Sequence, residues 1–442
     1  MREGSLEPPV RFPLEWQNPD FYDMAKIEAE MHRVFEICHG CRRCFNLCDS
    51  FPRLFDLVDA QPDEMAGVDP KDYKQVEAAC TLCDLCFMTK CPYVPPHEWA
   101  LDFPHLMLRY RAAELKATRS DPIGAQVTET DRNGRIAALA APVVNFANRN
   151  GVARAAMEAT IGVDREAALP KFHGRTFVLR SMEEKPEVNV RAPAYGRKAV
   201  LYATCFVNYN NPGIGMAARA VLARNGVETE VVYPRCCGMP QFERGDVARV
   251  AEHAQSVVDA LLPYVNEGYD VIALVPSCAL MLKFEWPLIL PQDARIKQLS
   301  DATFDVSEYV VDIARREGLA PGLEKLPGGV AVHLACHARA QNMGQKAAEM
   351  LRLIPEADLA VIERCSGHGG SWGVMKENFP IALKIGRPVA RQAISAEKTF
   401  VASECPLAAE HIVQGMARLD AGKAPEHSWH PIQLFARAYG LA

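Results

Sequence analysis

Several features of membrane, secreted and nucleic-acid-binding proteins are missing from this chain of 442 residues. No apolar run approaches the roughly 18 residues that a membrane-spanning helix requires. The N-terminal residues 1–9 are polar and acidic, and lack the apolar core of a secretory signal. There is no basic tract, and the net charge of −6 argues against nucleic acid, because phosphate binding depends on an excess of Lys and Arg. We therefore expect a cytoplasmic protein without a transmembrane segment, whose membrane contact, if any, is peripheral.

The motifs of several large enzyme classes are also absent. The chain has no P-loop, no H-E-x-x-H and no G-x-S-x-G. Residues 213–218 fit the pattern G-x-G-x-x-A, but this segment starts well beyond the end of the preceding predicted strand, and no suitably placed acidic residue follows. We therefore expect no flavin or nicotinamide site, so electrons have to enter from a partner.

What the chain has instead is cysteine. Its composition, 49% hydrophobic and 24% charged, is that of an ordinary globular protein of several domains. Fifteen cysteines are unusual beside this. In a reducing compartment such cysteines more often bind metals or carry redox chemistry than form disulfides.

Two dense cysteine runs lie near the N-terminus. Residues 38–48 read Cys-His-Gly-Cys-Arg-Arg-Cys-Phe-Asn-Leu-Cys, and residues 80–92 read Cys-Thr-Leu-Cys-Asp-Leu-Cys-Phe-Met-Thr-Lys-Cys-Pro. Both resemble bacterial ferredoxins, in which three closely spaced thiolates of one run bind a 4Fe-4S cube and the fourth binds the other cube. This resemblance implies two crossed clusters, one held by Cys38, Cys41, Cys44 and Cys91, and the other by Cys80, Cys83, Cys86 and Cys48.

The two runs depart from the ferredoxin pattern in two places. Asp49 replaces the usual proline after the first run, and one extra residue precedes Cys91. The alternative is a pair of zinc sites, because C-x2-C pairs also build zinc ribbons. A zinc site has no need of the third cysteine in each run, so we favour the clusters.

A tract without cysteine follows. Residues 99–118 have the apolar spacing of a packing helix, and residues 183–193 have the composition of a linker. Residues 136–147 are the most apolar part of this tract. We expect them to be buried in the protein's own core, with a partner protein or a bilayer surface as the alternatives.

After residue 196 the chain alternates apolar runs and amphipathic stretches, which is typical of parallel strands covered by helices. The first three predicted strands, 198–204, 230–235 and 270–277, end at Cys205, at Cys236-Cys237-Gly238 and at Cys278. The same order recurs about 130 residues later, where strands 329–335, 359–364 and 399–404 end at Cys336, Cys365 and Cys405. The recurrence indicates two homologous α/β lobes. Because open parallel sheets gather ligands at the carboxyl ends of their strands, Cys205, Cys236, Cys237 and Cys278 form a predicted cluster site.

A cysteine, then Cys-Cys-Gly, then a further cysteine, in tandem and behind two ferredoxin runs, resembles the CCG-domain family. That family includes heterodisulfide reductases, the iron-sulfur subunit of glycolate oxidase, the C subunit of anaerobic glycerol-3-phosphate dehydrogenase, which is closest in layout, and rubrerythrin-associated members. The resemblance covers residues 30–120 and 198–440. It implies iron-sulfur clusters, noncubane in the heterodisulfide reductases, that move electrons to disulfides, quinones or partner proteins.

The lobes differ from the fuller family pattern. Met281 and Ala408 stand where the family pattern has a fifth cysteine in each lobe. Without this cysteine the pattern does not specify the cluster type, so the first-lobe cluster is either cubane or noncubane. In the second lobe Ser366 replaces the second cysteine of the doublet. Three cysteines remain there, flanked by histidines, and we expect zinc or a second cluster held by Cys336, Cys365, Cys405, His337 and His368. His333, which also flanks these cysteines, is a further histidine candidate.

We therefore expect an α+β multi-domain protein. The predicted domains are a helical ferredoxin-like domain with two 4Fe-4S clusters (1–120), a helical connector and linker (121–196), a first CCG lobe (197–326) and a second CCG lobe (327–442). The predicted function is that of an iron-sulfur electron-transfer subunit of an oxidoreductase, with a flavoprotein, a rubrerythrin-like protein or quinone as redox partner; oligomer formation is left open. The alternative is a heterodisulfide reductase-like enzyme that reduces a disulfide at a CCG-domain cluster.

Overall fold

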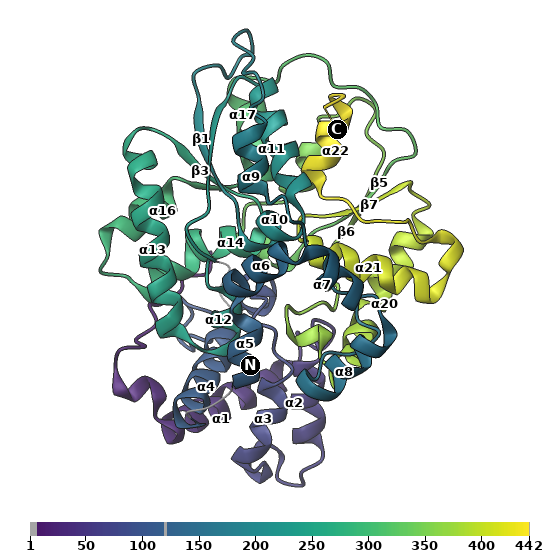
Figure 1. Ribbon diagram of the computed structural model, residues 1–442. Coiled ribbons are helices and arrows are strands. Elements are labelled where there is room, and N and C mark those ends of the chain that lie inside the picture. Colours follow the sequence, from purple (N-terminus) through teal and green to yellow (C-terminus); the bar gives the residue numbers. More distant parts are fainter. Residues whose placement is uncertain (1–6, 119–121, 442) are drawn as a thin grey trace. The chain divides into compact units, whose positions relative to one another are not determined.

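The computed structural model describes residues 7–118 and 122–441 (Figure 1). The chain divides into two compact units, and each is described by itself. The first contains the described residues up to Thr128, together with Gly238–Ala251 and Leu288–Pro291, and the second contains the remainder. Throughout both described ranges, no helix combines the length and the apolarity needed to cross a membrane.

The described part of the first unit consists of helices and loops. Its α-helices are α1 (Met24–Cys41), α2 (Ser50–Asp59), α3 (Tyr73–Glu77), α4 (Phe103–Thr118), α5 (Pro122–Thr128) and α12 (Met239–Arg244). Its short turns are η1 (Pro19–Tyr22), η2 (Glu64–Gly67), η3 (Pro70–Asp72) and the π-helical η4 (Cys86–Lys90). Helix α1 begins where the Asp23 carboxylate accepts the Lys26 N–H, and it ends where Arg42 turns left-handed at φ 52°.

The second unit contains two small parallel sheets. The first has the order β2-β1-β3-β4, from β1 (Lys198–Tyr202), β2 (Glu228–Val232), β3 (Asp270–Ala273) and β4 (Thr303–Asp305). The second has the order β6-β5-β7, from β5 (Val330–His333), β6 (Leu359–Ile362) and β7 (Phe400–Ser403). All pairings are parallel. The protein is thus α+β with two parallel sheets, as predicted, although the short strand β4 was not foreseen.

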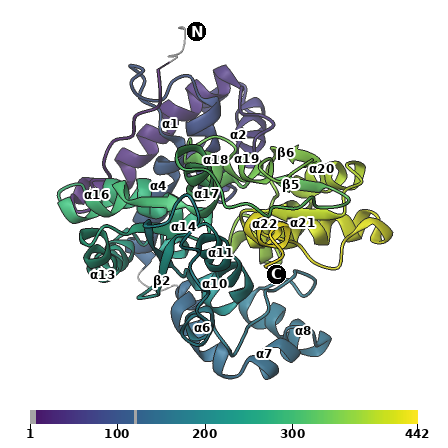
Figure 2. The ribbon, with the colours of Figure 1, turned by 90° about the horizontal axis from the view of Figure 1, so that it is seen from above.

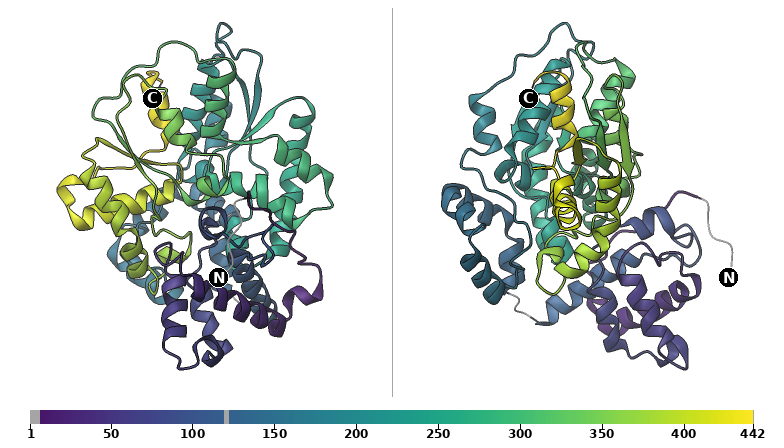
Figure 3. Two further views of the ribbon diagram at one scale, coloured as in Figure 1. Left: turned by 180° about the vertical axis from the view of Figure 1, so that it is seen from behind. Right: turned by 90° about the vertical axis from the view of Figure 1, so that its right-hand side faces the viewer.

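Helices make up most of the rest of the second unit. They are α6 (Thr130–Leu139), α7 (Ala141–Ala147), α8 (Gly151–Ile161), α9 (Phe177–Glu183), α10 (Cys205–Tyr209), α11 (Pro212–Arg224), α13 (Val247–Asn266), α14 (Pro276–Leu280), η5 (Met281–Glu285), α15 (Trp286–Ile289), α16 (Ala294–Asp301), α17 (Val306–Arg316), α18 (Cys336–Ala340), α19 (Lys346–Leu351), η6 (Trp372–Val374), α20 (Phe379–Ser395), α21 (Pro406–Leu419), η7 (Ala421–Lys423) and α22 (Pro431–Ala438). Helices α13 and α15 include residues of both units. Helices α11, α17 and α22 lie between the two sheets (Figures 1 and 3).

The glycine pattern at residues 213–218 lies in the first turns of α11 and is explained by packing. A Cβ on Gly215 would lie 2.6 Å from ring carbons of Phe177. Such a distance is far too short for an unstrained contact, so the glycine is what allows the aromatic ring of α9 to pack against α11.

The apolar tract 136–147 is not in the core. Ile136, Leu139, Val143 and Phe146 are 60%, 87%, 70% and 69% exposed. The prediction that this tract is buried is therefore wrong. Figure 2 shows α6, α7 and α8 at one margin of the second unit.

Candidate metal centres

Cysteines from both N-terminal runs line one small cavity in the first unit. Its volume is about 20 Å³, and its lining includes Cys38, Cys41, Cys44 and Cys91 among apolar side chains such as Phe51 and Phe55. Burial raises the pKa of the Cys44 thiol to about 12, with the neighbouring Cys91 and Cys41 as further causes. Burial likewise raises the pKa of Cys38, with Cys91 the next cause. Cys91, from the second run, therefore lies among the three cysteines of the first.

Cys48, from the first run, lies among the cysteines of the second. Its pKa is raised by burial and then by Cys83 and Cys80. The pKa of Cys86 is raised by burial and then by Cys83 and Cys80, with smaller contributions from Cys44 and Cys48. Buried thiols of this kind ionise only where a positive partner, such as iron, offsets the lost hydration.

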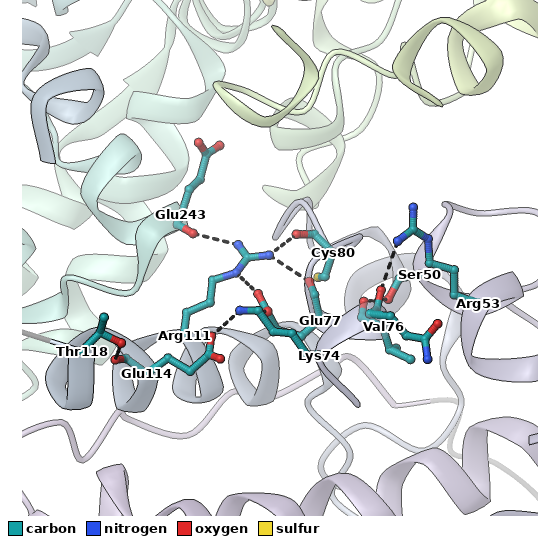
Figure 4. Close-up of polar contacts among 11 residues, drawn as sticks. Ser50, Arg53, Lys74, Val76, Glu77, Cys80, Arg111, Glu114, Thr118 and Glu243 are labelled. Atoms are coloured by element: carbon teal, nitrogen blue, oxygen red, sulfur yellow. Dashed lines mark hydrogen bonds and ion pairs between the residues drawn. The ribbon is translucent and has the colours of Figure 1, made fainter. Parts of the chain in front are cut away.

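The polypeptide beside these cysteines ties the two runs together. The Ser50 hydroxyl, close after Cys48, donates to the carbonyl oxygen of Val76 at 2.7 Å, in a buried hydrogen bond. Val76 belongs to α3, the helix that precedes Cys80. Helix α2 is thereby fixed against α3, which brings Cys48 to the second run (Figure 4).

The extra residue before Cys91 is taken up by a π-helical turn. In η4 the Cys91 N–H donates to the carbonyl oxygen of Cys86 at 2.8 Å, five residues back. A π-type turn accommodates one more residue than an α-turn without breaking the hydrogen bonding. The π-helical turn thus accommodates the extra residue locally, so that Cys91 can keep its place beside the first run.

Arg111 of α4 is the polar centre of the second cysteine run (Figure 4). Its guanidinium donates to the backbone oxygens of Glu243 at 2.7 Å and of Glu77 at 3.0 Å, and also to that of Cys80 and to the Glu77 carboxylate. The Glu77 side chain is only 2% exposed. Burial raises the pKa of Cys80 to about 11, and the Arg111 charge opposes this rise. The sequence predicts only that residues 99–118, which include Arg111, form a packing helix.

A second arginine supports the turn between Cys83 and Cys86. Asp84 in this turn has a left-handed backbone, at φ 61°. Arg11 pairs with both oxygens of Asp84, at 2.8 and 2.9 Å, and with Asp102 at 2.8 Å. Its guanidinium also lies 4.4 Å from the centre of the Phe87 ring. This bidentate pairing holds a strained turn next to two candidate ligands.

The four cysteines of the first lobe lie close together in the second unit. The sulfur atoms of Cys236 and Cys205 are 3.8 Å apart. Hydrogen bonds from Cys205 and Cys237 lower the pKa of Cys236. Contacts with Cys236 and Cys278, together with burial, raise the pKa of Cys237. Cys237 thus links the doublet to the cysteine that follows β3.

Side chains from four other elements hold the doublet loop. The Tyr202 hydroxyl donates to the carbonyl oxygen of Arg235 at 2.6 Å. His253 Nδ1 donates to that of Cys236 at 3.0 Å, and Trp286 Nε1 donates to that of Cys237 at 3.1 Å. The Cys236 N–H donates to the carboxylate of Asp131 in α6 at 2.9 Å. Because these contacts all go to backbone atoms, no sequence motif predicts them.

Two further polar atoms fit a sulfur-rich group at this position. His253 Nε2 and Thr130 Oγ1 are buried without a nitrogen or oxygen partner among the described residues. Both side chains contribute to the lowered pKa of Cys236. Buried polar groups normally find a partner, and bound iron-sulfur centres accept hydrogen bonds at sulfur. The four cysteines and these two side chains therefore fit an iron-sulfur cluster.

In the second lobe, Cys336, Cys365 and Cys405 follow β5, β6 and β7 closely. Since these strands are parallel neighbours, the three cysteines leave the sheet at one edge. Burial raises the pKa of Cys365, whose sulfur accepts the Gly367 N–H at 3.4 Å. Within the described part of the chain, no three Cys, His, Asp or Glu side chains converge as a single metal ion requires. The ligands of a cube need not converge in this way, because each binds a different iron.

The flanking histidines have different surroundings. Both ring nitrogens of His333 are engaged within the protein, with Ser403 Oγ and the Arg364 carbonyl oxygen, each at 2.9 Å. Nδ1 of His337 lies 2.9 Å from the Ser277 hydroxyl, next to Cys278 of the first lobe. His368 lines a cavity of about 10 Å³ with His411, and their ring centres are 6.0 Å apart. A ligand role for His337 and His368 stays a prediction.

Comparison with known proteins supports this arrangement of cysteines. The cysteine-rich domain named CCG matches twice, at residues 199–283 and 330–408. The C subunit of the anaerobic glycerol-3-phosphate dehydrogenase of Escherichia coli (strain K12) is 28% identical over 303 residues, which are 66% of this chain and 73% of that protein. Lactate utilization protein A of Bacillus cereus (strain B4264) is 27% identical over 187 residues, 40% of this chain and 74% of that protein.

These findings identify the class of protein. They support a metal-binding, electron-transfer role of the oxidoreductase type. Two segments of the chain are thus similar to the CCG domain.

Proposed function

We propose that this protein is the electron-transfer subunit of an oxidoreductase. Residues 1–120 form a ferredoxin-like domain in which the two crossed sets of four cysteines each hold a 4Fe-4S cluster. Residues 121–196 connect it to a first lobe, 197–326, where Cys205, Cys236, Cys237 and Cys278 hold a further cluster. The second lobe, 327–442, holds zinc or another cluster. When bound, such clusters take up and release single electrons.

The observation that carries the proposal is the exchange of one cysteine between the two runs. Cys91 lies with Cys38, Cys41 and Cys44, while Cys48 lies with Cys80, Cys83 and Cys86. Two zinc sites built from separate C-x2-C pairs would not need this exchange. Apolar side chains line the first cavity beside these cysteines, and Arg111 and Arg11 fix the backbone around the second set.

The partner we infer is a flavin dehydrogenase, a rubrerythrin-like protein or quinone, in the cytoplasm. A relative that is a dehydrogenase subunit supports the first of these. The alternative is reduction of a disulfide at the first lobe. Met281 and Ala408, at the positions of the missing fifth cysteines, are 0% and 4% exposed, so apolar side chains fill both places. Because these two positions are occupied by buried side chains, electron transfer is favoured over disulfide reduction, which would need a site open to the substrate.

An anaerobic oxidation experiment separates the two functions. The isolated chain is reduced with dithionite, freed of excess reductant and mixed with a quinone analogue, with a flavoprotein dehydrogenase or with oxidised glutathione. Because Cys236, Cys237 and Cys278 of the first lobe are buried, we expect the quinone or the flavoprotein, and not the disulfide, to restore the oxidised visible and EPR spectra. The disulfide should leave both spectra unchanged. If only the disulfide changes the EPR spectrum, the disulfide reductase is correct instead.

A further inference from the structure

A row of large apolar side chains is exposed on α6 and α7. This apolar stripe consists of Ile136, Leu139, Val143 and Phe146, which are 60% to 87% exposed. Ile136 and Leu139 are about one turn apart on α6, and Val143 and Phe146 are about one turn apart on α7, which begins directly after the non-helical Ala140. Single exposed apolar residues are common on protein surfaces, but a group of four on two consecutive helices marks an interaction surface.

The other face of these helices is fixed to the second unit, so the stripe has to point outward. A Cβ on Gly134 would lie 2.3 Å from the Tyr209 ring, which shows how closely α6 approaches α10. Asp131 of α6 accepts a hydrogen bond from the Tyr233 hydroxyl. The Asn145 side chain of α7 exchanges two hydrogen bonds of 2.8 Å with the backbone of Phe172.

The charged residues of the segment that carries the stripe are arginines, and the acidic residues beside it are engaged elsewhere: Asp131 with Tyr233 and Cys236, and Glu158 with Arg165. Residues 132–157 contain arginines at 132, 135, 149 and 154 and no Asp or Glu. Arg132, Arg135 and Arg149 are exposed; Arg132 and Arg135 lie on α6 four residues before Ile136 and Leu139, and Arg149 follows the end of α7. Arg154 is buried, where it donates to backbone oxygens. The surface therefore combines an apolar centre with cationic ends.

We propose that the apolar stripe and its exposed arginines bind the surface of an anionic phospholipid bilayer. Helices of 10 and 7 residues are too short to span a bilayer, but they can lie in its interface. The apolar side chains enter the acyl boundary, and the guanidinium groups reach the lipid phosphates. A protein partner is the less suitable occupant, because an interface of arginines alone would need a dedicated acidic surface opposite. This inference does not depend on the proposed electron transfer.

Vesicle sedimentation with the full, iron-loaded chain tests the proposal. The vesicles are either equimolar phosphatidylcholine and phosphatidylglycerol, or phosphatidylcholine alone. We expect the wild-type chain to sediment with the anionic vesicles. The double variant Leu139→Glu/Phe146→Glu should bind at least about tenfold more weakly, because two apolar side chains no longer enter the bilayer. The substitutions Arg132→Gln and Arg135→Gln should each weaken binding to anionic vesicles by about fivefold, because each removes one positive charge.

Val190→Glu is the matched control, because Val190 is 62% exposed but lies in the linker outside the stripe. It should bind anionic vesicles like the wild type. The visible spectrum of every variant should stay unchanged, since all the substituted positions are exposed. The proposal is overturned if the wild-type chain stays in the supernatant with anionic vesicles, as a protein-binding surface would cause it to do. It is overturned equally if the stripe variant sediments as well as the wild type.

Discussion

Substituting both members of the cysteine doublet, Cys236→Ser and Cys237→Ser, is expected to remove about four iron atoms per chain after anaerobic purification. The doublet supplies two of the four sulfur atoms gathered in the first lobe, and its loop is held by Asp131 and His253. Serine hydroxyls keep the shape of the loop but are poor iron ligands. The first-lobe cluster should be lost while the iron of the N-terminal cysteine runs is retained.

Iron analysis together with EPR of the reduced chain measures this effect. Met281→Leu is the matched control, because it removes a fully buried sulfur atom, three residues after Cys278, that the account does not assign to a metal. Its iron content should equal that of the wild type. A doublet variant that keeps the full iron content would show that the first lobe binds no cluster through these cysteines.

The second large effect is expected for Arg111→Met. The substitution removes the Arg111 hydrogen bonds to the backbone oxygens of Cys80, Glu77 and Glu243, and it leaves the almost fully buried Glu77 carboxylate with Lys74 as its remaining ion-pair partner. Breaking a buried ion pair in this way costs about 3–5 kcal/mol of the free energy of unfolding. Because the loop at Cys80 loses its support, the iron of the second cysteine run should also be released more easily.

Anaerobic urea unfolding, followed by tryptophan fluorescence and by visible absorbance, tests this prediction. Lys74→Met is the control, because Lys74 is 48% exposed and pairs with the same Glu77 carboxylate. A partly exposed pair of this kind contributes at most about 1 kcal/mol. Equal losses of stability in the two variants would mean that Arg111 does not support the loop.

The regular part of the fold could be predicted from the sequence because the apolar runs and the cysteines share one register. Six strands were predicted within a few residues of their observed bounds, such as β1 at Lys198–Tyr202. The strand β4, Thr303–Asp305, was missed because three residues give too short a pattern to distinguish a strand from a loop. The tract 136–147 was misplaced because apolarity alone does not say what covers a helix face.

The candidate site divides in the same way. The cysteines carry a spacing that can be recognised, whereas the residues that hold them do not. Asp131, His253 and Trp286 all bind backbone atoms of the doublet loop from distant parts of the chain. A hydrogen bond to a backbone atom leaves no requirement in the sequence of its partner, so only the folded structure reveals these contacts.

The most direct test of the central claim is a determination of iron and acid-labile sulfide on the anaerobically purified chain, combined with EPR of its reduced form. We expect about twelve iron atoms per chain or more, in cubes at the two N-terminal cysteine sets and a further cluster in the first lobe. A colourless, iron-free protein that still transfers electrons would contradict it.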